Sequence, residues 1–388
     1  FTVEDNINPT AIAQNITVQL DASGQAIITT ADVDNGSNDN CSMTLSLDIT
    51  SFDCNDVGAN TVTLTATDVS GNIHSTTATV TVEDNIAPNI AVTDIQVSLG
   101  SDGTVTVIPS TVDDGTTDAC GNLTWTLSDV TFDCSDIGAH FEVATVTDAN
   151  GTSSSANVII TVSDNTAPVI VTQPATLYLD ASGQATLDST DVISSIQENC
   201  SVVSISLSQV SFNTSSLGAN TVTVTVVDGS GNTSTATVPV TVLDAIAPNV
   251  VAKDITIPLD AQGSASISSM DVNNGSSDNV GIVTYTIDQN AFDCNDLGTN
   301  WVVLSATDAS GNLDTAWSKV TVVDVSAPSV VTQNYSINLD ASGSASITAS
   351  DINAGSFDNC GIASMSLSKT AFSCADLGQN TITFTAVD

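Results

Sequence analysis

Apolar and polar residues alternate one by one along much of the chain. Within residues 60–68, every second residue is apolar (Val62, Leu64 and Ala66), and the residues between them are threonines. Residues 78–82 repeat this alternation in the following segment. Alternation with a period of two is typical of a β-strand that has one face on a core and the other in water. Val, Ile and Thr are abundant, which also favours strands. The pattern therefore predicts an all-β protein.

Several phrases recur with a fixed spacing. The linker phrase VEDNINP returns as VEDNIAP, VSDNTAP, VLDAIAP and VVDVSAP, and its prolines are 79, 80, 80 and 80 residues apart. The phrase LDASGQA from Leu20 and the phrase FDCNDVGANTVTLTATD from Phe52 keep the same phase in later copies. Such a period indicates tandem structural units. We predict five repeats of about 80 residues, at residues 1–84, 85–164, 165–244, 245–324 and 325–388, the last lacking its final strand.

Turn signals divide each repeat into short segments. In the first repeat we expect strands at residues 15–20, 25–33, 43–48, near Phe52, 60–67 and 75–83. Short strands at this spacing suggest an immunoglobulin-like β-sandwich. Short proline linkers limit bending between the units. The predicted fold is therefore five tandem immunoglobulin-like β-sandwich repeats in an extended rod.

The charge balance narrows the choice of partners. The chain has 44 acidic and 3 basic residues, a formal net charge of −41. Nucleic acid and anionic membrane surfaces would be repelled, so neither is an expected partner. No apolar run reaches the roughly 18 residues of a membrane span. The chain begins and ends in mid-pattern, so we expect it to be a piece of a longer protein. Cations are the natural ligands of such a surface.

Three acidic positions are retained in every repeat: one in the linker, one in the loop before the 43–48 strand, and one at the end of the 60–67 strand. In a sandwich these three positions should meet at one pole of the repeat, beside the preceding linker. Clustered carboxylates repel one another unless a cation lies among them, and Ca²⁺ accepts many oxygen ligands in irregular geometry. We predict one Ca²⁺ per junction, held by Asp5, Asp39 and Asp68; Asp84, Asp118 and Asp148; Asp164, Glu198 and Asp228; Asp244, Asp278 and Asp308; and Asp324, Asp358 and Asp388.

These acids could instead serve the backbone alone, and that alternative stays open. Asp at a hairpin entry often caps its own turn, and Asp-Asn before Ala-Pro can simply shape a linker. Mg²⁺ is less suitable than Ca²⁺ because it needs near-octahedral geometry. A fourth acid, Asp32, recurs as Asp191, Asp271 and Asp351, but the second repeat has Thr111 there.

The eight cysteines leave their pairing open. Cys41/Cys54, Cys120/Cys134 and Cys360/Cys374 occupy the same two positions of their repeats. Repeat three keeps Cys200 but has Thr214 at the second position, and repeat four keeps Cys294 but has Val280 at the first. An exported protein favours disulfides. The two positions could instead lie at opposite poles, too far apart for a bond, with each cysteine acting as a buried apolar residue.

No catalytic constellation is present. His74, His140, Trp125, Trp301 and Trp317 do not recur between repeats, and no metalloprotease, hydrolase or nucleotide-binding motif occurs. We therefore do not expect an enzyme.

The motifs D-N-C at Cys41, F-D-C-x-D-V-G from Phe52, T-A-T-D-x-S-G-N from Thr65 and T-V-x-D-N-x-A-P across each linker resemble the hyalin-repeat and related immunoglobulin-like modules of bacterial surface proteins. The whole chain is similar to the repeat region of flavobacterial gliding adhesins. The resemblance implies an extracellular location on the exterior of the bacterial cell surface and the role of a stalk or spacer. It also implies that the processes served are gliding motility and surface attachment. Neighbouring repeats would be the partners. The alternatives are repeats that themselves bind surface polysaccharide, and accessory repeats of a secreted enzyme.

Overall fold

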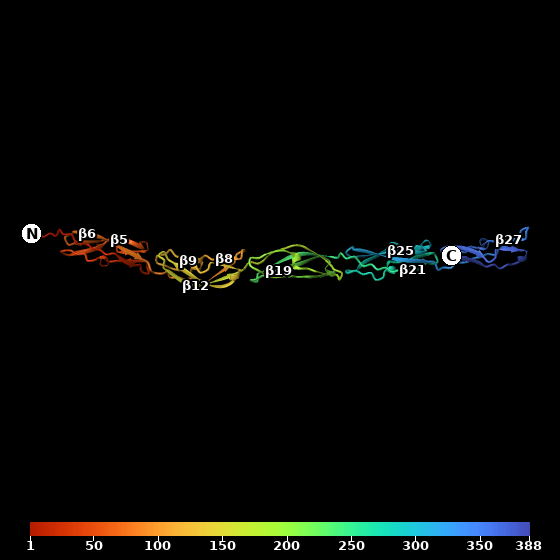
Figure 1. The fold of residues 1–388 in the computed structure, drawn as a ribbon, viewed down its shortest axis with the longest axis horizontal. Coiled ribbons are helices and arrows are strands. Elements are labelled where there is room, and N and C mark those ends of the chain that lie inside the picture. The colour runs from red at the N-terminus through yellow and green to blue at the C-terminus, as the bar shows by residue number, and fades with distance from the viewer. The chain divides into compact units, whose positions relative to one another are not determined.

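The computed structural model describes residues 1–388 and consists of strands with only single turns of helix between them. The predicted all-β fold is confirmed. The chain forms two compact units: one comprises Phe1–Ile170, Ser195–Ile205 and Thr225–Thr235, and the other comprises the remaining residues. The same order of elements returns along the chain, and Figure 1 labels the long strands β5, β6, β12, β19 and β25. The repeat boundaries remain a prediction.

The first two repeats contain matching elements. Repeat one comprises β1 (Ile16–Gln19), β2 (Ala26–Ile27), α1 (Thr30–Val33), β3 (Met43–Leu47), β4 (Ser51–Phe52), the 3-10 helix η1 (Cys54–Asp56), β5 (Gly58–Asp68) and β6 (Ile73–Glu83). Repeat two comprises β7 (Ile95–Ser98), β8 (Thr104–Thr106), η2 (Pro109–Val112), β9 (Thr124–Leu127), β10 (Thr131–Asp133), η3 (Cys134–Asp136), β11 (Gly138–Thr147) and β12 (Ser153–Ser163).

The later repeats follow the same order with small differences. Repeat three comprises β13 (Val169–Thr172), β14 (Ala175–Tyr178), β15 (Gln184–Thr186), α2 (Ser189–Val192), β16 (Ile193–Gln197), β17 (Val202–Leu207), β18 (Ser211–Asn213), η4 (Thr214–Ser216), β19 (Gly218–Asp228) and β20 (Thr233–Leu243). Repeat four comprises β21 (Ile255–Pro258), β22 (Ser264–Ser266), α3 (Ser269–Val272), β23 (Ile282–Ile287), β24 (Ala291–Asp293), η5 (Cys294–Asp296), β25 (Gly298–Asp308) and β26 (Leu313–Val323). Repeat five comprises β27 (Ser344–Ser346), α4 (Ala349–Ile352), β28 (Ser364–Leu367), β29 (Ala371–Ser373), η6 (Cys374–Asp376) and β30 (Phe384–Val387).

Each complete repeat pairs a four-stranded sheet with a two-stranded one. In repeat one the larger sheet has the order β1-β6-β5-β3, with β1 parallel to β6, and the smaller sheet joins β2 to β4. Repeats two and four have the same arrangement. Val62, Leu64 and Val80 of the larger sheet are fully buried, and they form one core with Phe52 of the smaller sheet. The alternating threonines lie on the opposite face, as the period of two requires.

One predicted strand is wrong in part. Residues 25–33 form only the two-residue strand β2, and the chain then turns into α1. The carboxylate of Asp32 accepts a hydrogen bond of 2.7 Å from the backbone N–H of Thr29, the N-cap, which is half of a capping box. The recurring acids Asp191, Asp271 and Asp351 do the same in α2, α3 and α4. In repeat two, which has Thr111, a 3-10 helix that begins with Pro109 replaces this turn.

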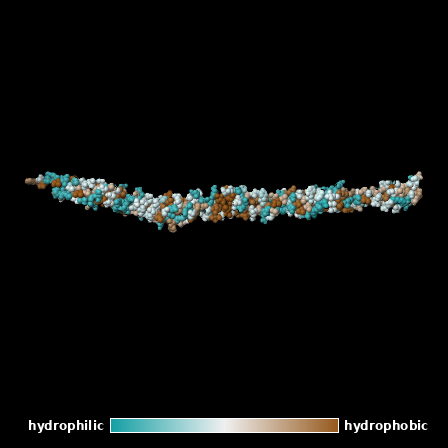
Figure 2. Space-filling view, in the orientation of Figure 1, coloured by the Kyte–Doolittle hydropathy of each residue, from teal (hydrophilic) through white to brown (hydrophobic).

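On the face visible in Figure 2, hydrophilic and hydrophobic residues are interspersed along the chain. None of the short helices is long or apolar enough to span a membrane.

Candidate metal centres at the repeat junctions

Each junction is built from three segments, and the first is the linker. Asp84 directly follows β6, and its Oδ1 accepts a hydrogen bond of 3.1 Å from the backbone N–H of Ile86. The other linker acids make the same turn, with distances of 2.9 to 3.1 Å, at Asp5, Asp164, Asp244 and Asp324. These acids therefore shape the linker with one oxygen, as the turn interpretation expects. The other oxygen of Asp244 is buried without a partner, whereas those of Asp5 and Asp84 accept hydrogen bonds from the side chains of Asn40 and Asn150.

The second segment is the loop that precedes β3, β9, β17, β23 or β28. Oδ2 of Asp278 accepts hydrogen bonds of 2.8 Å from the backbone N–H groups of Val280 and Gly281. Asp118 makes the corresponding bonds to Cys120 and Gly121. The second carboxylate oxygen of four of these loop acids is buried and has no hydrogen-bond partner: Asp39, Glu198, Asp278 and Asp358. A buried polar atom without a partner is unfavourable, so these oxygens point to a ligand.

The third segment is the hairpin turn between the two long strands. Oδ1 of Asp308 accepts bonds of 2.8 Å from the backbone N–H groups of Ser310 and Asn312, and Oδ2 accepts one of 2.8 Å from the side chain of Asn312. Burial raises the pKa of Asp308, but these hydrogen bonds favour the charged form and hold the pKa below its ordinary value. Asp68, Asp148 and Asp228 show the same balance. The turn acids are thus held as carboxylates.

Four of the five junctions bring all three predicted acids together. Within each group, one oxygen of every acid lies within 4.8 Å of the others: Asp84, Asp118 and Asp148; Asp164, Glu198 and Asp228; Asp244, Asp278 and Asp308; Asp324, Asp358 and Asp388. The linker and turn acids of the three inner groups are only 2–7% exposed. The expected convergence of these acids is therefore present, and their role as metal ligands remains a prediction.

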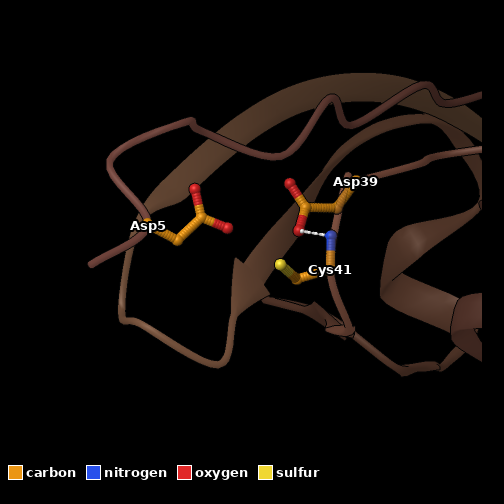
Figure 3. A group of neighbouring side chains, drawn as sticks. All are labelled: Asp5, Asp39 and Cys41. Carbon is orange, nitrogen blue, oxygen red and sulfur yellow. Dashed lines mark hydrogen bonds between the residues drawn. The ribbon is translucent and has the colours of Figure 1, made fainter. Parts of the chain in front are cut away.

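The acid group at the start of repeat one, which we call junction one, differs from the other four. Asp5 and Asp39 meet there with the thiol of Cys41 instead of Asp68, and the backbone N–H of Cys41 donates to Asp39 over 2.9 Å (Figure 3). The hydrogen bond to Asp5 is the main cause that raises the pKa of the Cys41 thiol, followed by burial and by the charges of the nearby acids. A thiol is a poor ligand for Ca²⁺, which prefers oxygen. Asp68 does not join this group, although the side chain of Asn72 donates both to the carboxylate of Asp68 and to the backbone oxygen of Asp5. The role of Asp5, Asp39 and Asp68 as metal ligands remains a prediction.

No basic side chain balances the clustered charges. The chain has only three basic residues, and its one ion pair joins Lys369 to Asp376, neither of which belongs to an acid cluster. Three ionised carboxylates within this distance repel one another strongly when partly buried. A bound cation removes that repulsion and also supplies a partner for the orphaned oxygens.

The donor set fits Ca²⁺ in the four oxygen-only clusters. Ca²⁺ takes roughly six to eight oxygen ligands, from carboxylates, amides, backbone carbonyls and water. Besides the three acids, the side-chain oxygens of Asn199, Asn279 and Asn359 are buried at the junctions without a partner. These asparagines were not among the predicted ligands, although the D-N-C phrase repeats them.

The same asparagines connect three parts of the junction. The amide nitrogen of Asn279 donates to the backbone oxygen of Asp180 in the preceding repeat, at 3.1 Å, and to Oδ1 of Asp244 in the linker, at 3.2 Å. Asn199 and Asn359 make equivalent pairs of bonds. Each asparagine thereby links a repeat to its predecessor at the site of the acids.

Three disulfides also cross the junctions. Cys54 bonds to Cys120, Cys134 to Cys200 and Cys294 to Cys360, each across 66 residues, with Cα atoms 5.2 to 5.5 Å apart. The within-repeat pairs Cys41–Cys54, Cys120–Cys134 and Cys360–Cys374 do not form, because the two cysteines of a repeat lie at opposite poles. The view of each cysteine as a plain apolar residue is also wrong for these six. Cys41 and Cys374 are free and exposed.

The sequence held a signal for this pairing. Thr214 and Val280 are the two positions where a cysteine is missing, and they are also 66 residues apart. The two losses therefore belong to one junction, between repeats three and four, rather than to two separate repeats.

Comparisons with solved structures give the extracellular domains of desmocollin, cadherin and protocadherin proteins as similar. The human desmocollin-1 ectodomain is 13% identical, with 97% of this chain and 96% of that chain covered and a TM-score of 0.24. Drosophila N-cadherin EC1-4 is 12% identical, with 80% and 99% covered and a TM-score of 0.26. The protocadherin gamma B4 extracellular domain is 17% identical, with 87% and 70% covered and a TM-score of 0.25. No family model and no curated protein matches the chain. The resemblance to hyalin repeats and gliding adhesins stays a prediction.

Proposed function

We propose that this chain is a structural spacer of an extracellular adhesin, whose junctions are stiffened by Ca²⁺ and by disulfides that join neighbouring repeats. The single observation that carries the proposal is the junction itself. Three acids converge there with buried, unpartnered oxygens and no basic residue to balance them. The site lies where one repeat meets the next, so a bound cation would act on the joint between repeats rather than on a substrate.

The proposed location follows from the disulfides and the motif resemblance. Disulfides between repeats persist in oxidising surroundings outside the cytosol. The resemblance to bacterial surface repeats would place the chain on the exterior of a bacterial outer membrane, with gliding and attachment as the process served. Force carried along such a chain would pass through every junction.

Calcium dependence of thermal melting tests the metal part. A ligand that binds only the native state raises stability by about 2.7 kcal/mol per site at a concentration of 100 times its Kd. We expect Ca²⁺ to raise the melting midpoint relative to EDTA. Asp278→Asn should reduce the rise by removing one site, whereas Asp314→Asn, an equal charge change at an exposed position of β26, should leave it intact. An unchanged midpoint in the native chain, with no calcium retained in native mass spectrometry, would refute calcium binding.

Small-angle X-ray scattering tests the stiffening. We expect a larger and better defined maximum dimension in Ca²⁺ than in EDTA, because the metal would limit movement at each junction. Identical scattering profiles in the two conditions, at saturating calcium, would contradict a stiffening role.

A second candidate function, polysaccharide binding, is favoured by two exposed tryptophans. Trp301 of β25 and Trp317 of β26 are 58% and 64% exposed. Trp301 lies opposite Lys319 and Val303 opposite Trp317, so the two indoles are diagonal neighbours on one face of the sheet. Flat apolar rings of this kind can stack on sugars. Glycan-array binding that is lost in Trp301→Ala/Trp317→Ala but kept in Phe141→Ala, another exposed aromatic, would support it; no binding by the native chain would refute it.

A further inference from the structure

The junctions differ in how many buried oxygen atoms they leave without a hydrogen-bond partner. The junction between repeats three and four has three such oxygens, on Asp244, Asp278 and Asn279. The junctions between repeats two and three and between repeats four and five have two each, on Glu198 and Asn199 and on Asp358 and Asn359. The junction between repeats one and two has none. The four oxygen-only clusters are therefore not equivalent as cation sites.

The junction between repeats one and two satisfies its oxygens from within. Ala119 stands where the other three junctions have an asparagine. The second carboxylate oxygen of Asp84 accepts a hydrogen bond of 3.1 Å from the side chain of Asn150, whereas the corresponding oxygen of Asp244 has no partner. A cation in the first cluster would have to compete with that bond, so it would gain less free energy there.

The junction with the most unpartnered oxygens is also the one without a disulfide. Thr214 and Val280 stand there in place of the two cysteines that cross each of the other three junctions. A cross-link holds the loop acid beside the preceding repeat whether or not a cation is bound. Without a cross-link, the position of Asp278 depends on non-covalent contacts alone.

Those contacts centre on Asn279. Its side-chain nitrogen donates to the backbone oxygen of Asp180 in repeat three, at 3.1 Å, and to Oδ1 of the linker acid Asp244, at 3.2 Å. A Cβ atom at Gly183 would lie 3.0 Å from the backbone oxygen of Asn279, so repeats three and four approach closely at this loop. The side-chain oxygen of Asn279 is left without a partner. One amide thus faces the preceding repeat with its nitrogen and offers its oxygen to a ligand.

We propose that Ca²⁺ takes the place of the missing disulfide between repeats three and four. This cluster is the tightest of the four calcium sites, Asn279 is one of its ligands, and the docking of the two repeats depends on the bound ion. The inference rests on the proposed calcium function. A cation here gives partners to three buried oxygens without breaking a hydrogen bond. By reciprocity, whatever docking adds to the calcium affinity, calcium adds to the docking.

Native mass spectrometry and calorimetric titration of the full chain test the ranking. At one equivalent of Ca²⁺ we expect one ion to be retained, and Asp278→Asn should abolish it. Asn279→Ala should weaken this first ion at least about tenfold, which is about 1.4 kcal/mol. Asn274→Ala, at an exposed asparagine five residues earlier, should not change it. Asp118→Asn should remove an ion that binds only at higher calcium.

A further variant separates a ligand from a merely structural residue. Asn279→Asp and Asn279→Ala both lose the nitrogen that donates to Asp180 and Asp244, but only Asn279→Asp keeps a side-chain oxygen. If that oxygen binds the metal, Asn279→Asp should retain the first ion. Equal weakening by the two variants would show that Asn279 is not a ligand and would overturn its assigned role.

Hydrogen exchange of the native chain tests the docking. The backbone N–H groups of Val280 and Gly281 donate to Asp278, and those of Cys120 and Gly121 donate to Asp118 in the same way. In EDTA, exchange within residues 278–281 should become at least about tenfold faster. Residues 118–121 should change much less until dithiothreitol reduces the disulfides, because their loop is covalently held.

The possible failures are distinguishable. If the native chain retains no Ca²⁺, the proposed calcium function is wrong, and this inference is wrong with it. If Ca²⁺ binds but the first ion survives Asp278→Asn, or if EDTA speeds exchange equally in residues 278–281 and 118–121, the calcium function stands and the special role of the junction between repeats three and four is overturned.

Discussion

The junction between repeats three and four is the natural place to add a disulfide, because Thr214 and Val280 stand where the other junctions have bonded cysteines. Thr214 begins η4, as Cys54, Cys134 and Cys294 begin their 3-10 helices, and Val280 follows Asn279 as Cys200 and Cys360 follow theirs. We predict that Thr214→Cys/Val280→Cys oxidises spontaneously to a fourth bond between repeats.

The size of the effect follows from the loop that the bond closes. The separation is 66 residues, as in the three native bonds. A cross-link of this length lowers the entropy of the unfolded chain enough to stabilise the folded state by about 4 kcal/mol, an upper limit because engineered bonds often give less. At about 2–4 °C per kcal/mol for a stretch of two repeats, the melting midpoint of this region should rise by up to roughly 8–16 °C.

The controls are the single variants Thr214→Cys and Val280→Cys, which keep the native disulfides. Calorimetry compares the midpoints, thiol titration of the unfolded protein counts the free cysteines, and mass spectrometry identifies the linked peptides. The oxidised double variant should retain only the two free cysteines of the native chain. If both added thiols stay free, or if the bond forms without raising the midpoint above those of the single variants, the shared geometry of the junctions is refuted.

Two further perturbations probe the same joints. Because the folded-state pKa of Asp308 is below its ordinary value of 3.8, the stabilisation from its charge is full above that value and is lost as pH falls through the lower folded-state pKa. The gap in melting midpoint between the native chain and Asp308→Asn, measured in EDTA, should therefore be constant near neutral pH and shrink below pH 3.8; a gap that widens with acid would contradict this sign. Gly183→Ala introduces a side chain at a left-handed residue, which costs about 1–2 kcal/mol, and also a clash with the docked Asn279. Gly275→Ala is the matched control, since it has a similar φ of +82° but nothing within 4 Å. Chemical denaturation should show the larger loss of stability for Gly183→Ala, and equal losses would mean that Asn279 does not pack against this glycine.

The alternation of apolar residues and threonines was sufficient to predict the long strands, because one residue in two must face the core. The helical turn α1 escaped prediction because four residues are too few to show a helical period, although the Thr29 and Asp32 spacing of its cap was visible. The acids of four junctions could be placed because a sandwich returns its loops to one pole. In junction one the prediction missed the free thiol of Cys41, which lies in the group in place of Asp68.

The disulfides were missed for a different physical reason. Pairing was considered only inside each repeat, where the two cysteine positions lie at opposite poles. The bonded partner is in the next repeat, and it is found only when the end of one repeat is compared with the start of the next. Asn199, Asn279 and Asn359 were missed because each bonds to a backbone oxygen of the preceding repeat, which no local sequence pattern displays.

The spacing of the three bonds has a mechanical consequence. Residues 55–119, 135–199 and 295–359 lie inside covalently closed loops, so a pull on the two ends of the chain cannot straighten them. Residues 201–293 have no such bypass, and each residue released there adds about 3.4 Å of length. Residues 1–53, 121–133 and 361–388 also lie outside the closed loops, but residues 201–293 form the longest such stretch, so tension should release the most length there. Single-molecule pulling would show this as longer extension steps after reduction, and identical step lengths in oxidised and reduced chains would exclude it.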